Sequence, residues 1–177
     1  MNKPFHPLVS TMMKMCSRTL SQGHDVAPQF TVLTKDNKIE TLEITMDDER
    51  VIARNMMRAA SVVTEAVFGV FVSEGWEVTV REGAKGQIVP PSEAEDRIEV
   101  LLIVQYDGNG SSSISLPIRR GSGGRFICLD DTKAEFVPSD GGAIAGAIPP
   151  AADYSKFRMH VPALKFYLKT HGVGLGD

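Results

Sequence analysis

Cysteine, tryptophan and long apolar runs are all scarce in this chain of 177 residues, which has two cysteines, one tryptophan and 7% aromatic residues. The two thiols, Cys16 and Cys128, are too few for a disulfide framework and lack the paired spacing of a zinc site. The apolar runs are too short to cross a bilayer, and the stretch MNKPFHPLVSTMMKMC lacks the apolar core of a signal peptide. We therefore expect a cytoplasmic protein with no membrane partner.

The sequence motifs of common catalytic and metal sites are also missing. The four histidines are scattered and form no H-x-x-x-H or H-E-x-x-H pattern, and the chain has no G-x-S-x-G elbow and no P-loop. The sequence therefore predicts no metal, no cofactor and no readable set of catalytic residues. A hydrolase whose residues come together from distant positions remains a third functional hypothesis.

Charge of one sign is limited too, since the net charge is only -3. Residues 1–150 carry a balance of -5, whereas residues 151–177 carry +2. Their basic side chains are Lys156, Arg158, Lys165 and Lys169. A mildly acidic body does not favour nucleic-acid binding.

The apolar periodicity predicts an α+β domain. Helical spacing covers 8–21 and 46–67, and two β-rich runs flank a turn at 35–38. Alternating patterns follow at 68–81, 97–106 and 114–118, and a further strand follows in RFICLD. We expect an antiparallel sheet of about five strands, with the N-terminal helix and the long central helix packed on one face. The predicted organisation is a domain at 1–137, a Gly/Ala/Pro linker at 138–152 and a basic-aromatic arm at 153–177.

Glu74 interrupts an apolar row in the strand FVSEGWEV. A buried, ionised carboxylate without a partner costs several kcal/mol or shifts its pKa. A β-bulge at Gly75, or a kink, would turn Glu74 outward. The functional alternative keeps this carboxylate on the sheet beside Trp76, paired with Arg97 or with an arginine of another subunit. In that case Glu74, Trp76 and Arg97 are candidate partner-binding residues.

A glycine turn surrounded by arginines is a second candidate site. Exposed amides in the turn 121–124 can form an anion-binding nest beside Arg119, Arg120 and Arg125. The stretch lacks the P-loop pattern, and a plain hairpin explains it as well. These arginines support the alternative function, which is binding of a nucleotide-like anion or another small molecule.

The C-terminal arm is the third candidate, because aromatic and apolar side chains alternate there with basic ones. Its candidate partner-binding residues are Tyr154, Phe157, Leu164 and Tyr167. A short helix is expected around 161–169, with Pro162 in its first turn. The arm could dock on its own domain, on a second copy or on a partner protein.

The stretches GHDVAPQFTVL, SEGWEV and SEAEDRIEVLLIV resemble a loose group of uncharacterised small bacterial and phage proteins. That resemblance covers 23–129 and implies no activity. The order helix, hairpin, helix, meander is similar to the roadblock and longin-type scaffolds, whose members are mostly dimeric adaptors or regulators. The leading hypothesis is therefore a non-catalytic interaction or regulatory module, dimeric and fitting an accessory protein of a phage or mobile element.

Overall fold

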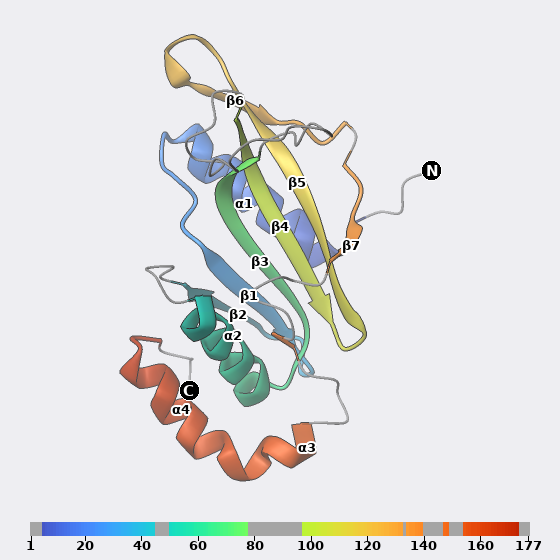
Figure 1. Cartoon of the computed structure of the whole chain (residues 1–177), viewed down its shortest axis with the longest axis vertical. Helices are drawn as coiled ribbons and strands as arrows, with labels where there is room; N and C mark the ends of the chain where they lie inside the picture. Colours follow the sequence, from blue (N-terminus) through green and yellow to red (C-terminus); the bar gives the residue numbers. More distant parts are fainter. Residues whose placement is uncertain are drawn as a thin grey trace, which may run out of the picture.

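The computed structural model describes residues 5–44, 50–77, 97–132, 134–139, 147–148 and 154–173. They form one antiparallel sheet with helices on both of its faces (Figure 1). The elements are α1 (Pro7–Ser21), β1 (Gln29–Thr34), β2 (Ile39–Glu43), α2 (Arg50–Thr64), β3 (Ala66–Glu77), β4 (Ile98–Asp107), β5 (Gly110–Arg120), the 3₁₀ turn η2 (Ser122–Gly124), β6 (Phe126–Leu129), β7 (Val137–Ser139), α3 (Tyr154–Phe157), the 3₁₀ turn η5 (Arg158–His160) and α4 (Val161–Thr170).

The strand order in the described part of the sheet is β2-β1-β3-β4-β5-β6, and β7 pairs with the other end of β5. This α+β architecture confirms the predicted fold class, but the sheet has seven described strands instead of about five. The additional strand β7 is only three residues long and contains Pro138, so it has no alternating pattern that a sequence could reveal.

The prediction that both long helices pack on one face is wrong. α1 covers the face that carries Val70, Val72, Leu101 and Ile103, which we call the α1 face. α2 covers the opposite face, called here the α2 face, and Figure 1 shows the two helices on either side of the sheet. The physical reason is that β3 and β4 are apolar at both parities, so each of their faces needs a cover.

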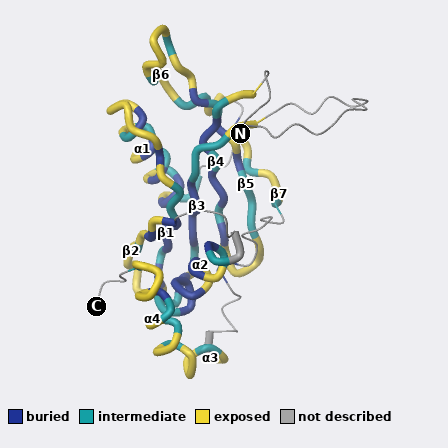
Figure 2. The backbone as a smooth tube through the Cα atoms, turned by 60° about the vertical axis from the view of Figure 1, so that its left-hand side comes forward, coloured by how far each residue is buried: buried dark blue, intermediate teal, exposed yellow. Residues whose placement is uncertain are grey.

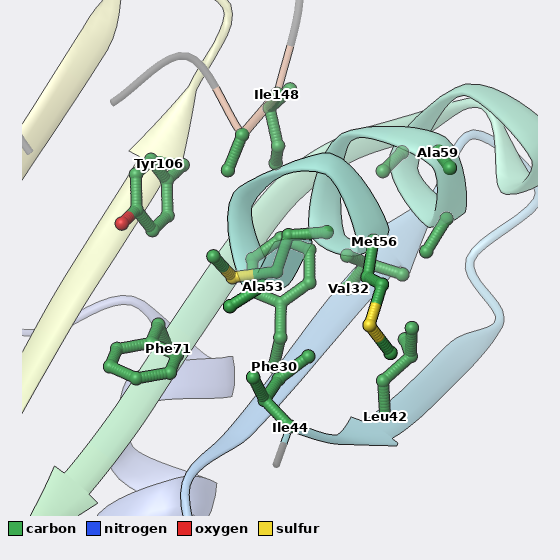
Figure 3. Close-up of a cluster of buried hydrophobic side chains, with 14 of the residues drawn as sticks. Phe30, Val32, Leu42, Ile44, Ala53, Met56, Ala59, Phe71, Tyr106 and Ile148 are labelled. Carbon is green, nitrogen blue, oxygen red and sulfur yellow. The ribbon is translucent and has the colours of Figure 1, made fainter. Parts of the chain in front are cut away.

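The core of the α2 face joins α2 to four strands, β1 to β4, and to the arm. Phe30, Phe71 and Tyr106 supply the aromatic side chains from the sheet, and the Phe30 and Tyr106 rings meet edge to face with centroids 6.0 Å apart (Figure 3). Met56 and Met57 of α2 are 6% and 0% exposed above them. Alanines at 53, 59 and 60 let the helix approach the strands closely.

The predicted C-terminal end of the central helix, at 67, is also wrong, while residues 46–49 lie outside the described part. α2 ends at Thr64 because Glu65 adopts a left-handed conformation with φ of 48°. Its carbonyl accepts a bond from the Lys35 N–H at 3.1 Å, and its side chain forms an ion pair with Lys35. Val67, predicted to lie in the helix stripe, is an exposed strand residue instead.

The stretch predicted as a linker at 138–152 contributes to the core at two described positions. Ala147 and Ile148 are 0% and 6% exposed and belong to the cluster beneath α2. Ile148 lies over Gly69 of β3, where a Cβ atom would be only 2.8 Å from the Ile148 Cδ1 atom. The absence of a side chain at Gly69 therefore makes room for Ile148.

Candidate functional site

One end of the sheet exposes the only tryptophan of the chain. Trp76 lies near the end of β3, opposite Glu99 of β4, and 43% of its surface is accessible. The Arg97 guanidinium carbon lies 4.5 Å from the centroid of the indole ring, in a cation–π arrangement. The structure thus brings together Trp76 and Arg97, which the sequence placed in one neighbourhood. We call this pair and the adjacent Glu74, Glu99 and Arg120 the Trp76 surface.

Glu74 stays in its apolar row, because the expected bulge at Gly75 does not exist. β3 and β4 pair without interruption from Phe68 opposite Asp107 to Glu77 opposite Ile98, so the bulge prediction is wrong. Glu74 therefore points to the α1 face, on the same side as Val70 and Val72.

The partner of Glu74 is a backbone group and not Arg97. The Val26 N–H donates to the Glu74 Oε1 atom at 2.5 Å, across 48 residues of sequence. Val26 is 4% exposed, so the carboxylate satisfies a buried donor in the connection between α1 and β1. The carboxylate thus links this connection to the sheet.

Burial raises the pKa of the Glu74 carboxyl above its ordinary value. The Val26 hydrogen bond opposes that rise, the negative charges of Asp25 and Glu99 add to it, and the positive charge of Arg120 lowers the pKa again. Glu74 therefore places a carboxyl with a raised pKa at the edge of a surface that carries both signs of charge.

Arg120 and Glu99 form the fixed ion pair of this surface. The Arg120 Nε–H donates to Glu99 Oε2 at 2.7 Å, and the Arg120 Nη2 group forms the second bond of a bidentate pair with Glu99 Oε1. This pair raises the pKa of Arg120. A bidentate arginine–carboxylate pair holds both side chains in one orientation, so this part of the surface is preorganised.

The three arginines predicted to bind an anion do not converge. Arg119 donates to Asp130 Oδ2 at 2.7 Å, whereas Arg120 pairs with Glu99 on the opposite face of β5. The Thr132 hydroxyl and the Arg119 guanidinium lower the pKa of the Asp130 carboxyl to about 2, so Asp130 stays charged at neutral pH. Arg125 is exposed beside the glycine turn. Two of the three cations are thus already neutralised within the chain.

The C-terminal arm docks on its own domain, which was one of the three alternatives for it. Leu168 of α4 is 1% exposed in the core cluster of the α2 face, and Leu164 and Tyr167 are partly buried against that cluster. Phe157 lies under the Arg58 guanidinium of α2, 5.8 Å from ring centroid to Cζ. The Tyr154 side chain lies outside the described residues. Most predicted partner-binding side chains of the arm therefore face α2.

The described ranges hold no metal centre, and the buried thiol of Cys16 is not activated. No group of three or more His, Cys, Asp or Glu side chains there could hold a metal ion. Cys16 is buried on α1, and burial, with a smaller contribution from Glu74, raises the pKa of its thiol to about 11. Cys16 is therefore a protonated core residue at neutral pH, and not an activated nucleophile.

Sequence reasoning did not identify Glu99 and Arg120 as a pair, nor Val26 as the partner of Glu74. The sequence predicts Arg120 only as part of the anion turn, because a pairing across 21 residues has no local signal. The one available signal was the alternation of side chains along each strand. Once the register is known, this alternation places four side chains on the α1 face: Glu74, Trp76, Glu99 and Arg120.

Comparison with known proteins gives no relative for this chain: no family model, curated protein or solved structure shows significant similarity. The resemblances stated from the sequence therefore stay predictions. No described helix combines the length and the apolar character needed to cross a bilayer.

Proposed function

We propose that this chain is a non-catalytic protein-interaction module and that the Trp76 surface contacts its partner protein. The observation that carries this proposal is the Trp76–Arg97 pair, an indole 43% exposed with a guanidinium against its ring. Tryptophan and arginine are the residues most often found at the energetic centre of protein interfaces. Both are here presented together at one end of the sheet.

The surroundings of this pair support recognition of a protein. Glu74 is fixed by the Val26 N–H and Glu99 by Arg120, so the carboxylates beside the indole do not need to be ordered when a partner binds. A preorganised aromatic centre with charges of both signs around it is typical of a protein-binding surface.

The alternative of anion binding at the glycine turn has less support from the geometry. Arg119 and Arg120 point to opposite faces and each already neutralises a carboxylate. An anion would have to break both pairs before these arginines could bind it together.

The test is capture of a partner from the protein's own cells, followed by native mass spectrometry of the purified complex. We expect the tagged chain to retain a protein in fixed stoichiometry. Trp76→Ala and Arg97→Ala should each reduce that retention by a factor of about 30 or more, as expected for a hot-spot residue. Phe166→Ala is the matched control, because Phe166 is an aromatic residue 70% exposed on α4.

Retention of the same protein by wild type, Trp76→Ala and Arg97→Ala alike would refute the proposed surface. Deletion of the arm is not a suitable test, because it would remove the buried Leu168 from the core cluster of the α2 face. Point substitutions at exposed positions leave that core intact.

A further inference from the structure

β2 ends the described sheet on one side, and its outer backbone edge has a defined pattern. The Thr34 N–H donates to the Lys38 carbonyl at 2.9 Å, and the Ile44 N–H donates to the Pro28 carbonyl at 2.8 Å. Bonded and non-bonded pairs alternate along an antiparallel ladder. Because Lys38 and Ile44 both bond to the β1 side, the even-numbered residues between them, Glu40 and Leu42, bond to β1 as well.

It follows that Ile39, Thr41 and Glu43 direct their N–H and C=O groups away from β1. The side chains of these three residues are exposed, and Ile39 is 58% accessible, an unusual value for an isoleucine in a sheet. Figure 2 shows β2 with exposed residues at this margin of the sheet. No described strand pairs with this edge. An unprotected edge of this kind can accept another strand.

We propose that the strand added at this edge is β2 of a second copy of the chain, in an antiparallel arrangement with a two-fold axis at Thr41. Thr41 then lies opposite Thr41 of the second copy, Ile39 lies opposite Glu43, and Glu40 lies opposite Leu42. The outward groups of Ile39, Thr41 and Glu43 form the hydrogen-bonded pairs of the new ladder. The two sheets become one continuous sheet across the axis.

The sequence of β2, IETLE, favours itself as this partner. With the axis at Thr41 all five residues are paired, and each glutamate lies opposite an apolar side chain. An axis at Glu40 would instead set the two Glu40 carboxylates opposite each other, and directly opposed like charges are destabilising. Charge therefore disfavours the axis at Glu40, and the axis at Thr41 pairs more residues of β2 than any other axis does.

The pairing of two five-residue strands is a small interface, so we expect a weak dimer. Sedimentation equilibrium of the full chain from about 1 to 500 µM should show conversion from monomer to dimer. The Trp76→Ala variant should dimerise like wild type, because Trp76 lies on β3 and not on this edge. A loss of dimerisation and a loss of partner capture are therefore distinguishable.

Two substitutions at Ile39 test the register by the sign of their effects. Ile39→Glu places a carboxylate opposite Glu43 of the second copy, twice by symmetry, and should raise the dimer Kd by about 2- to 30-fold. Ile39→Lys places an ammonium there and should leave the Kd unchanged or lower it. Because Ile39 is exposed, both variants should fold, which far-UV circular dichroism would verify.

A second pair of variants tests the backbone bonds. Thr41→Pro removes the outward N–H and should abolish the dimer. Thr41→Val is the matched control. Both substitutions remove the side-chain bond to Thr31 at 3.0 Å, but valine keeps the backbone N–H, so Thr41→Val should still dimerise. A wild-type chain that stays monomeric over the whole range, or Ile39→Glu and Ile39→Lys variants that weaken the dimer equally, would overturn the proposal.

Discussion

Gly69→Ala should destabilise the fold although alanine suits a strand better than glycine does. The added Cβ would lie 2.8 Å from Ile148 Cδ1 and 2.9 Å from two carbons of the Phe30 ring. Overpacking of a core costs about 1–3 kcal/mol. The smaller backbone entropy of alanine in the unfolded chain returns about 0.4–1 kcal/mol. We therefore expect a net loss of about 0.5–2.5 kcal/mol in the free energy of unfolding.

A double-mutant cycle with Ile148→Ala tests whether this clash is the cause. Ile148→Ala alone leaves a cavity and should cost about 2–5 kcal/mol. In that background the Cδ1 atom is gone and the Phe30 ring can shift into the space. The double variant should therefore be more stable than the sum of the single losses predicts, by about 1–2 kcal/mol.

The assay is equilibrium unfolding in urea, followed by far-UV circular dichroism and by the fluorescence of Trp76. Gly75→Ala is the matched control, because Gly75 lies on the same strand and the same face, and a Cβ atom added there would have no atom within 4 Å of it. Additivity of Gly69→Ala and Ile148→Ala to within about 0.5 kcal/mol would refute the reasoning. A loss in Gly75→Ala equal to that in Gly69→Ala would refute it too.

Two further predictions concern buried polar groups. Glu74→Ala leaves the buried Val26 N–H without its acceptor and should cost about 1–3 kcal/mol, whereas Glu74→Gln keeps an acceptor oxygen. Because burial raises the folded-state pKa of Glu74, the stability that this residue contributes is complete at low pH and falls as pH rises through that pKa. The free energy of unfolding of Glu74→Gln, relative to that of wild type, should therefore increase between pH 4 and pH 8. Urea titrations that show a constant difference over this range would contradict the prediction. Tyr106→Phe removes a buried hydroxyl that has no partner among the described residues and should raise the free energy of unfolding by about 1 kcal/mol; a thermal unfolding midpoint below that of wild type would contradict this.

The sequence predicted the elements whose periodicity is strong. α1 and the body of α2 lie where the apolar spacing indicated, because each helix buries one continuous stripe. The β1–β2 hairpin lies where two β-rich runs flank a turn. The α2 end could not be predicted, because it depends on the φ of Glu65 and on a tertiary bond to Lys35. β7 has three residues and no pattern of its own.

The candidate site was predictable only as a neighbourhood. Trp76 and Arg97 could be grouped because Trp76 lies near the end of one strand and Arg97 lies directly before the next strand. Whether Glu74 faced the core or solvent depended on the register between β3 and β4, which a single glycine at 75 made ambiguous. The pairing of Arg120 with Glu99 crosses a hairpin, and the arm's choice of α2 depends on surfaces that exist only in the folded domain.

The cover of β3 and β4 on both faces has a consequence for how the molecule opens. Each of these strands is paired on both sides, with α1 over one face and α2 over the other. Their central amides can exchange with deuterium only when the whole domain unfolds. β6, with two exposed residues among its four, can open locally while that centre stays closed. The sheet thus has a slowly exchanging middle and a margin that fluctuates independently of it.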